Sequence, residues 1–187
     1  MKILIVSDSH LYNDELQAVT EYYKGRVDLM VNCGDTALPV DHEILRPFDY
    51  VVKGNHDLAD FPVFTIHNDI MITHGHYFNV YAGYDELVRL CRDNECRYCF
   101  HGHTHVPTHQ VVDGIHFVNP GAIMMNRGSY GFATYALAGL DDNHFDVHFH
   151  HAHTHEIVDD IVLEEGLKQL EEFKTFVRKL NEKTSKF

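Results

Sequence analysis

The sequence predicts an α/β fold in which two β-sheets lie between helices. Three observations support this fold class. The first half of the chain alternates apolar runs with segments of helical periodicity, and the second half consists mainly of strands joined by tight turns. No linker, internal repeat or Pro/Gly-rich boundary separates the halves. Strand–helix alternation is typical of parallel sheets, whereas hairpins add antiparallel strands. We therefore expect a single domain over residues 1–187.

The elements of the first half follow from local patterns. Uninterrupted β-branched and apolar runs predict buried strands, and apolar residues at every third or fourth position predict surface helices. The expected strands are Ile3–Val6, Val27–Val31, Tyr50–Val52, Phe61–Ile66, Ile70–Thr73 and Tyr98–Phe100. The expected helices are Leu11–Lys24 and Val80–Arg92, and a turn at Asn68-Asp69 joins two of the strands.

The second half is predicted to add a hairpin, two further strands and a final helix. An Asp113-Gly114 turn separates Thr108–Val112 from Ile115–Val118, and strands follow at Gly131–Ala138 and His144–His150. Residues 163–187 are expected to form a C-terminal amphipathic helix. Its apolar stripe consists of Leu163, Leu167, Leu170, Phe173, Val177 and Leu180. Because an exposed stripe would be adhesive, we expect it to pack on the domain, with a homo-oligomer contact as the alternative.

Composition restricts the classes of partner. The chain has 15 basic and 28 acidic residues, which gives a net charge of −13. This charge disfavours binding of a nucleic-acid polymer or of an anionic membrane. The 17 histidines are unusual for 187 residues, and histidine is the commonest metal ligand. Bound divalent cations could therefore supply the positive charge that an anionic substrate needs.

The cysteines and the apolar runs predict a cytoplasmic protein. No apolar stretch reaches the length of a secretory signal or a membrane span. The C-x-x-C pair has no second pair at zinc-ribbon spacing. We expect reduced thiols at all four cysteines, which are Cys33, Cys91, Cys96 and Cys99, and burial rather than a zinc site for the last three.

Side chains that can bind metals follow five of the predicted strands. The clusters are Ser7–His10, Asn32–Asp35, Lys53–Asp57, Thr73–His76 and His101–His105. Ligands bind beyond the carboxyl ends of strands in open α/β sheets, so we expect the five clusters to meet at one rim. Mixed imidazole, carboxylate and amide ligands suit Mn, Fe, Zn or Co. Polar residues that merely cap a sheet would not recur at five strand ends in this order.

The five clusters resemble the motifs of the calcineurin-like metallophosphoesterases. The matching residues are Asp8-x-His10, Gly34-Asp35, Gly54-Asn55-His56-Asp57, His74-Gly75-His76 and Gly102-His103-x-His105. The short chain, with Asn119-Pro120-Gly121 after the last motif, is similar to the small YfcE-type phosphodiesterases. This resemblance covers residues 1–140. It implies a four-layer sandwich, with two mixed β-sheets flanked by helices and two metals at the sheet rim.

The resemblance also implies a role for each motif residue. Asp8, His10 and His105 would hold one metal, and Asn55, His74 and His103 the other. Asp35 would bridge the two ions, for which we expect Mn, with Fe, Zn, Co or Ni as alternatives. Two metals can activate a water to hydroxide and clamp a phosphoryl group. His56 would bind no metal and would act as the general acid.

Two positions depart from the motifs of the protein Ser/Thr phosphatases in this superfamily. Lys53 stands where those enzymes have Arg, and Leu38 stands where they have the Asp that supports the catalytic histidine. Both departures argue against a protein phosphatase, and they leave open which residue orients His56. Ala122 also replaces a serine that is frequent in the small relatives.

Further polar residues could have either a functional or a structural role. His76 could contact substrate or support the ligands, and Asn119 could brace the site or be a turn residue. Arg127 could contact a phosphate oxygen, but a solvated loop residue is favoured. His101 is interpreted as a core or interface histidine. For the histidine-rich segment 144–155, a solvated strand face and loop is favoured over a specific metal site.

The sequence thus predicts a two-metal phosphoesterase, specifically a phosphodiesterase acting on a small phosphate ester. One alternative is a monophosphatase or nucleotide pyrophosphohydrolase that uses the same ligands. A second is a metal-binding scaffold similar to a eukaryotic retromer subunit of this fold. That subunit has lost the catalytic histidine, whereas this chain has His56 and all seven ligands.

Overall fold

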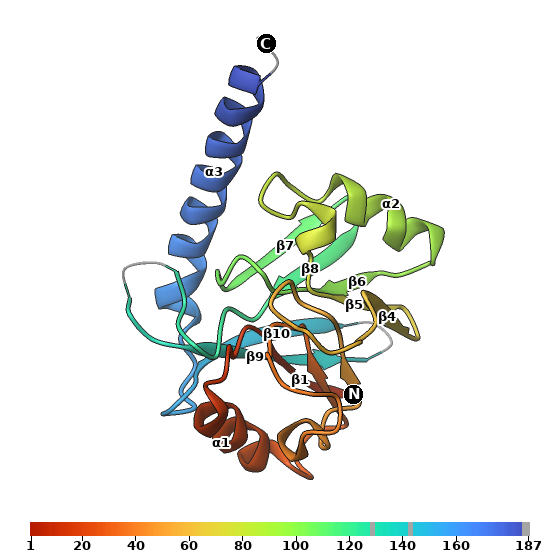
Figure 1. Cartoon of the computed structure of the whole chain (residues 1–187), viewed down its shortest axis with the longest axis vertical. Helices are drawn as coiled ribbons and strands as arrows, with labels where there is room; N and C mark the ends of the chain where they lie inside the picture. The colour runs from red at the N-terminus through yellow and green to blue at the C-terminus, as the bar shows by residue number, and fades with distance from the viewer. Residues whose placement is uncertain (128–129, 142–143, 185–187) are drawn as a thin grey trace.

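Two five-stranded sheets occupy the centre of the computed structural model, which describes residues 1–127, 130–141 and 144–184 (Figure 1). The first sheet has the order β10-β9-β1-β2-β3 and the second the order β4-β5-β6-β8-β7. The first contains β1 (Lys2–Val6), β2 (Leu29–Asn32), β3 (Tyr50–Val51), β9 (Thr134–Leu140) and β10 (Phe145–His151). The second contains β4 (Phe64–His67), β5 (Ile70–Thr73), β6 (Tyr98–Phe100), β7 (Thr108–Val112) and β8 (Ile115–Asn119).

Both sheets are mixed, as the motif resemblance implied. In the first sheet β1 and β2, and β2 and β3, are parallel pairs, whereas β9 runs antiparallel to β1 and to β10. In the second sheet β6 is parallel to both β5 and β8, and β4 and β7 are antiparallel edge strands. The parallel strands end directly before the motif residues, so pairing collects those residues at strand ends.

Alternate residues of the strands face different hydrophobic cores. Ile3 of β1 belongs to the core between the two sheets, whereas Leu4 belongs to the core beneath α1 (Asn13–Tyr23). Met71 of β5 belongs to a third core, beneath α2 (Asp85–Asp93). The layers therefore follow the order α1, first sheet, second sheet, α2, as Figure 1 shows. This order confirms the four-layer sandwich, and burial of both faces explains the uninterrupted apolar runs.

The last helix, α3 (Asp159–Thr184), packs on the domain only along its first part. Val162 and Leu170 are buried, whereas Phe176 is 62% exposed and Leu180 47% exposed. Figure 1 shows the far half of α3 rising away from the sheets. The helix begins four residues before the predicted start, and the predicted end at 185–187 lies outside the described residues. A homo-oligomer contact through its far half stays a prediction.

Left-handed backbone conformations shorten two of the predicted helices. Leu11 has φ 70°, and α1 begins two residues after it. Asn79 and Gly83 have φ values of 48° and 140°, and α2 accordingly begins at Asp85 rather than at Val80. These conformations are incompatible with a right-handed helix. Apolar spacing alone did not reveal them.

Two strands begin three residues later than predicted, and five others, β1, β2, β3, β8 and β10, differ from their predicted bounds by one or two residues. The strand predicted from Phe61 begins at Phe64, because Pro62 has no amide hydrogen for a ladder and its carbonyl accepts from Lys53 N at 2.8 Å. The strand predicted at Gly131–Ala138 runs instead from Thr134 to Leu140, in register with β1. The Asp113-Gly114 turn is present, with φ of 54° and 80°.

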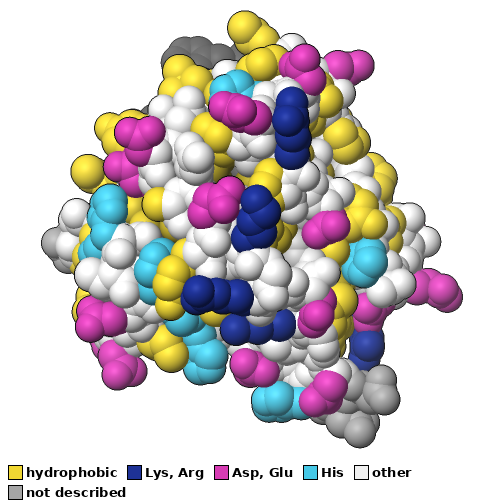
Figure 2. All heavy atoms as spheres, turned by 90° about the horizontal axis from the view of Figure 1, so that it is seen from below, with side chains coloured by type: hydrophobic (Ala, Val, Ile, Leu, Met, Phe, Trp, Pro, Cys, Tyr) yellow, Lys and Arg dark blue, Asp and Glu magenta, His cyan; other side chains and the backbone are white. Residues whose placement is uncertain are grey.

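The surface carries both signs of charge. On the face in Figure 2, Lys and Arg side chains lie among Asp and Glu and do not form a continuous basic surface. Within the described ranges of the chain, no helix combines the length and the hydrophobicity that crossing a membrane would require. Two short 3₁₀ turns, η1 (Glu43–Leu45) and η2 (His76–Phe78), complete the described elements.

Candidate metal centre

Seven candidate ligands lie in loops that follow strands of both sheets. The loops after β1, β2 and β3 carry Asp8, His10, Asp35 and Asn55, and the loops after β5 and β6 carry His74, His103 and His105. Main-chain hydrogen bonds join these loops. His10 N donates to Asp35 O at 2.9 Å, and Gly102 N donates to His74 O at 3.1 Å. The structure therefore brings strand ends of both sheets to one place, as the sequence predicts.

The side chains of five of these residues converge within a few ångströms. His105 Nε2 lies 3.1 Å from Asp8 Oδ1 and 3.3 Å from His10 Nε2. His74 Nε2 lies 3.3 Å from Asp35 Oδ2, and His10 Nε2 lies 3.6 Å from the same oxygen. Three overlapping groups of the described residues could each hold an ion: Asp8, His10 and His105; Asp8, Asp35 and His74; and His10, Asp35 and His56. Asp35 Oδ2 thus faces both His10 and His74.

Hydrogen bonds to the outer atoms of the candidate ligands orient the other atoms of these side chains toward the cluster. His74 Nδ1 donates to Cys33 O at 2.7 Å, so Nε2 faces inward, where it is buried and makes no hydrogen bond within the described chain. Ser7 Oγ and His103 N donate to Asp8 Oδ2, which leaves Oδ1 facing the imidazoles. A buried polar atom without a partner is costly, and a divalent cation at this point would remove that cost.

Five of the candidate ligands have left-handed backbone conformations. Their φ values are 55° for Asp8, 43° for His10, 57° for Asp35, 70° for His103 and 57° for His105. Such φ values are uncommon in residues other than glycine and cluster at functional sites. They occur here in the loops after β1, β2 and β6. Asn55 and His74, in the loops after β3 and β5, do not have positive φ.

At two motif positions only glycine fits, because atoms of a neighbouring loop lie too close for a Cβ atom. A Cβ atom at Gly102 would overlap Ser7 Oγ and Asp8 Oδ2, and a Cβ atom at Gly54 would overlap the Asp35 side chain and backbone nitrogen. Any larger residue would displace a candidate ligand. The glycines in these motifs therefore set the distances between neighbouring loops.

Asp57, the last residue of the Gly54–Asp57 motif, organises the loops around Asp35. Its Oδ2 accepts from Asp35 N and Gly54 N, both at 2.8 Å. Its Oδ1 accepts from Ala37 N at 2.7 Å and from Thr36 Oγ1 at 3.1 Å. The carboxylate is buried, and both of its oxygens accept hydrogen bonds from these loops. Its role is therefore to support the backbone at Asp35.

The protonation states of the cluster suit cation binding. Burial raises the pKa of Asp8, but His74 and His105 outweigh it and hold that pKa well below its usual value. Burial lowers the pKa of His103 to about 4. Burial also lowers the pKa of His74, but the carboxylates of Asp8 and Asp35 outweigh it and raise that pKa. At neutral pH the site thus offers ionised carboxylates and, at His103, a neutral imidazole, the forms that bind metals.

A surface hollow of about 310 Å³ gives access to the cluster. His56 lies exposed at this hollow, and its ring is 5.0 Å from that of His10. The His56 backbone N–H donates to Asp35 Oδ1 at 2.7 Å. The His56 side chain makes no hydrogen bond within the described chain, and one of its ring nitrogens lies within 4.8 Å of ligand atoms of His10 and Asp35. The remaining lining residues are His10, Asp35, Asn55, Tyr81, His103, His105, Met124 and Arg127.

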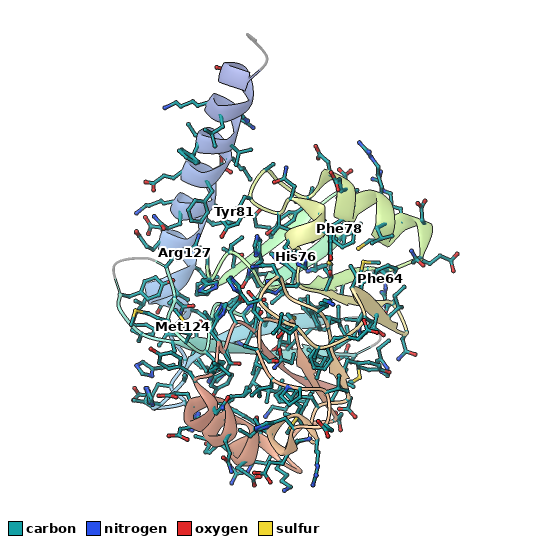
Figure 3. The ribbon with its side chains drawn as sticks, in the orientation of Figure 1. Phe64, His76, Phe78, Tyr81, Met124 and Arg127 are labelled. Atoms are coloured by element: carbon teal, nitrogen blue, oxygen red, sulfur yellow. The ribbon has the colours of Figure 1, made fainter. Side chains whose placement is uncertain are left out.

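The three further residues that the sequence singled out, His76, Asn119 and Arg127, occupy different positions around the cluster. Figure 3 labels His76 and Arg127. His76 is half-buried beside His74, with ring centroids 5.3 Å apart, and its Nδ1 is buried without a partner in the described chain. Asn119 is buried and donates to Gly102 O at 2.7 Å and Thr104 Oγ1 at 3.0 Å, so it braces the last motif. Arg127 is exposed at the hollow itself.

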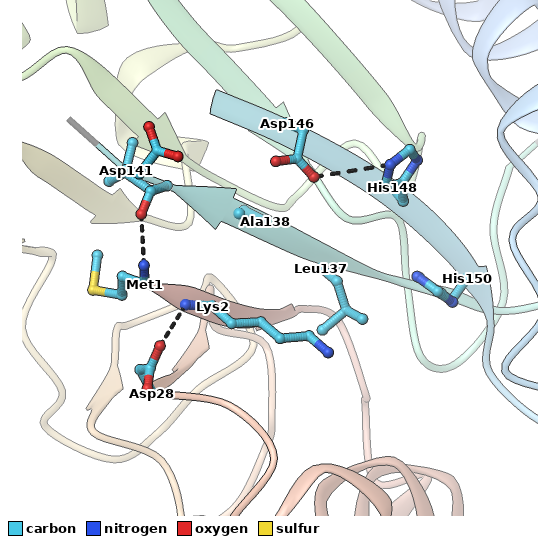
Figure 4. Close-up of a pocket in the computed structure, with 11 residues that line it drawn as sticks. Met1, Lys2, Asp28, Leu137, Ala138, Asp141, Asp146, His148 and His150 are labelled. Carbon is cyan, nitrogen blue, oxygen red and sulfur yellow. Dashed lines mark hydrogen bonds and ion pairs between the residues drawn. The ribbon is translucent and has the colours of Figure 1, made fainter. Parts of the chain in front are cut away.

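A wider hollow of about 520 Å³ lies at the opposite end of β1, away from the cluster (Figure 4). Its carboxylates are engaged: Asp28 accepts from Lys2 N at 2.7 Å, and Asp146 lies 3.8 Å from His148 Nε2. The histidine-rich segment 144–155 begins here and continues along β10, where His150 is buried. Within the described residues, the groups suited to a metal all lie at the motif cluster instead.

Other histidine and cysteine positions are structural. His101 is fully buried, its Nε2 lies 3.1 Å from Tyr84 Oη, and burial lowers its pKa to about 4. This is the core position that the sequence favoured. The four cysteines are buried and free of disulfides.

Sequence reasoning missed three residues beside the hollow. Tyr81 and Met124 line it, and Phe173 of α3 packs edge-on against Tyr81 with ring centroids 5.0 Å apart. Tyr81 Oη donates to the carbonyl oxygen of His103 at 3.1 Å. None of the three lies in a motif, and Phe173 was assigned to a packing stripe. No local signal in the sequence distinguishes them from ordinary apolar residues.

Comparison with known proteins agrees with the motif set. The family model of the calcineurin-like phosphoesterase superfamily domain matches residues 1–143, which include all five clusters. The probable metallophosphoesterase YsnB of Bacillus subtilis is 35% identical over 171 residues, which cover 85% of this chain and 96% of the relative.

Solved structures show the same architecture. A predicted phosphoesterase from Streptococcus pneumoniae superposes with a TM-score of 0.77 at 33% identity, over 84% of this chain and 92% of that one. The Escherichia coli phosphoesterase YfcE gives 0.58 at 20% identity, over 84% and 97% of the two chains. Vps29 of Entamoeba histolytica in complex with Zn²⁺ gives 0.63 at 21% identity, over 84% and 96%. The last two similarities show the fold alone.

Proposed function

The chain belongs to the calcineurin-like phosphoesterase superfamily, and from this premise we propose that it is a metal-dependent phosphodiesterase acting on small phosphodiesters. The observation that carries the proposal is the convergence of Asp8, His10, Asp35, His74 and His105 beside the exposed His56. A phosphodiester would meet the ligand cluster and an imidazole within one hollow.

Two of the residue groups that could hold a metal, Asp8 with His10 and His105 and Asp8 with Asp35 and His74, support two divalent ions. We assign one ion to Asp8, His10 and His105, and the other to Asn55, His74 and His103, with Asp35 between them. When bound, the ions would supply Lewis-acid activation of water and charge stabilisation on the phosphoryl oxygens. We propose Mn for both positions, because imidazole, carboxylate and amide ligands suit it, with Fe, Zn, Co or Ni as alternatives.

His56 is the proposed general acid. His56 is exposed and lines the hollow, and its ring lies beside that of His10, so its imidazole could donate a proton to the leaving oxygen of a bound ester. Asp35 fixes the His56 backbone through the 2.7 Å hydrogen bond to its N–H. This contact couples the placement of the acid to the bridging carboxylate.

The proposed substrate is small, because the hollow is only about 310 Å³ in volume and carries little positive charge. Among the described residues that line it, Arg127 is the only Lys or Arg. A polyanion would need a longer basic track. We also propose a cytoplasmic location, since all four cysteines are buried as free thiols.

Two other functions make different predictions. A monophosphatase or pyrophosphohydrolase would use the same ligands and would differ in substrate preference. A Vps29-like scaffold would bind metal at the same site and lack turnover. The exposed His56 favours an enzyme, because a scaffold has no use for an imidazole beside the cluster.

The test is hydrolysis of bis-p-nitrophenyl phosphate against p-nitrophenyl phosphate. Metal-stripped protein is assayed after addition of Mn, Co, Ni, Mg or Zn. We expect metal-dependent cleavage with preference for the diester. His56→Ala should lower kcat by on the order of 10²- to 10⁴-fold. The matched control is His153→Ala, an exposed histidine in the loop after β10.

Three outcomes would overturn parts of the proposal. A strong preference for the monoester would refute the diester class and keep the metal chemistry. Equal activity of His56→Ala and wild type would refute the general acid. A folded, metal-loaded wild type that cleaves neither ester would favour the scaffold.

A further inference from the structure

The C-terminal helix reaches the rim of the candidate active site. Phe173 of α3 lies against Tyr81, with ring centroids 5.0 Å apart and planes at 84°. The guanidinium carbon of Arg127 lies 5.6 Å from each of these two ring centroids. Tyr81 and Arg127 both line the hollow. Figure 3 shows Tyr81 and Arg127 between the ligand loops and α3.

Hydrogen bonds tie this aromatic contact to the ligand loop. Arg127 Nη1 donates to Tyr81 Oη at 2.7 Å, and Tyr81 Oη donates to the carbonyl oxygen of His103 at 3.1 Å. The backbone nitrogen of Arg127 donates to the carbonyl oxygen of His105 at 2.9 Å. Arg127 is thus fixed to two candidate metal ligands through their main chains. The position of Arg127 therefore depends on the positions of His103 and His105.

The guanidinium keeps most of its hydrogen-bonding capacity. It has five N–H donors, and its side chain makes one hydrogen bond within the described chain, to Tyr81. Contact with aromatic rings attracts a guanidinium through its face and leaves its edge available to an anion. Because Arg127 is the only Lys or Arg among the described residues that line the hollow, it is the cationic side chain there that an anion would meet.

The first part of α3 is anchored beside the same loop. Gly166 is buried, and a Cβ atom there would overlap the carbonyl oxygen of Pro107, two residues after His105. Val162 and Leu170 are buried on either side of it. The helix that carries Phe173 is therefore held at close range to the last motif. α3 lies beyond residues 1–143, the part that the family model matches.

We infer that α3 is a working part of the active site, in which Phe173 acts as a positioning residue. Together with Tyr81, Phe173 holds the Arg127 guanidinium where it binds a phosphoryl oxygen of the substrate. This inference rests on the proposed function and names a substrate contact for it. Arg127 binds the charge of the phosphate, and Phe173 acts only through Arg127.

The test compares ligand binding and turnover in the metal-loaded, full-length protein. We expect Arg127→Ala to raise the KM for bis-p-nitrophenyl phosphate and the Kd for inorganic phosphate on the order of tenfold, with a smaller change in kcat. Phe173→Leu retains an apolar side chain and removes the ring face. It should raise both constants roughly threefold to tenfold. Phe173→Tyr, which retains the ring, should restore them.

The matched control is Phe176→Ala, on the same helix and 62% exposed, which should leave both constants unchanged. A double variant decides the mechanism. In the Arg127→Ala background, Phe173→Leu should have no further effect, because the residue through which it acts is gone. Circular dichroism and thermal midpoints confirm that each variant is folded.

Two results would overturn the inference. One is Phe173→Leu with the phosphate affinity of the wild type. The other is an equal loss from Phe173→Leu with and without Arg127, which would indicate general packing. Phosphate binding is measured by calorimetry without turnover. A wild type that cleaves no ester would therefore refute the proposed function while the binding data still decide this inference.

Discussion

Asp8, His10, Asp35, His103 and His105 adopt positive φ although none is glycine. A left-handed conformation of this kind costs on the order of 1–3 kcal/mol in a residue with a side chain. The surrounding hydrogen bonds hold the backbone there, including those from Asp8 N to Gly34 O and from His10 N to Asp35 O, both 2.9 Å. The candidate ligands are thus held in place before any metal binds. Hydrogen bonds between the loops offset the conformational cost of their positive φ.

The Asp57 carboxylate accepts four of the hydrogen bonds that hold these loops. We expect Asp57→Asn to lower the free energy of unfolding by roughly 2–4 kcal/mol, because an amide NH₂ would face backbone N–H donors where a carboxylate oxygen now accepts. Urea denaturation of metal-stripped protein measures the loss without a contribution from metal binding. The control is Asp60→Asn, an exposed carboxylate nearby, for which a change within about 0.5 kcal/mol is expected.

A variant Asp57→Asn as stable as wild type would show that the four hydrogen bonds do not hold the loops. A normal stability combined with lost metal binding would instead place Asp57 among the ligands, contrary to its hydrogen bonds in the structure.

At the scale of elements, α3 is held close to the last motif by the absence of a side chain at Gly166. Replacing glycine by alanine inside a helix ordinarily stabilises it by about 1 kcal/mol. Here we expect the opposite sign. Gly166→Ala should destabilise the protein by roughly 1–3 kcal/mol, because the new methyl group overlaps the Pro107 carbonyl and must displace the helix.

Thermal unfolding checks the sign. The control is Thr175→Ala, at an exposed position of the same helix, which should be neutral or slightly stabilising. A stabilised Gly166→Ala would contradict the close approach and would weaken the argument that α3 is fixed beside the site.

The strands and their polar ends could be predicted from the sequence because both signals are local. Ile70–Thr73, Tyr98–Phe100 and Thr108–Val112 have the predicted bounds, since each apolar or alternating run ends at a polar residue or a turn. Helix starts were predicted less well. Apolar periodicity continues through Leu11 and Val80, where the backbone or its neighbours are left-handed.

The rim around Arg127 could not be predicted from local patterns. Tyr81, Arg127 and Phe173 come from three segments separated by 46 residues each, and only the folded chain brings them together. Phe173 also satisfies the apolar stripe of an amphipathic helix, so periodicity assigns it to packing. The motif residues could be assigned to a site from the sequence, because polar residues at buried strand ends have few structural roles.

At the scale of the whole molecule, the candidate centre spans both sheets. Asp8, Asp35 and Asn55 follow strands of the first sheet, and His74 and His103 follow strands of the second. The ligands meet only when the two sheets pack on their common core. Divalent ions at this point would also offset buried negative charge in a chain whose net charge is −13. The candidate metal centre therefore depends on the packing of the two sheets against each other.

The most direct test of the metal-dependent centre is a Mn titration of the metal-stripped chain. Hydrolysis of bis-p-nitrophenyl phosphate is followed at a protein concentration well above the metal dissociation constant. We expect no activity without metal and a rise that ends at two ions per chain. His56→Ala should take up the same two ions and remain inactive, and Asp35→Asn should bind fewer. Full activity in the stripped protein, or saturation at a single ion, would contradict the two-ion centre.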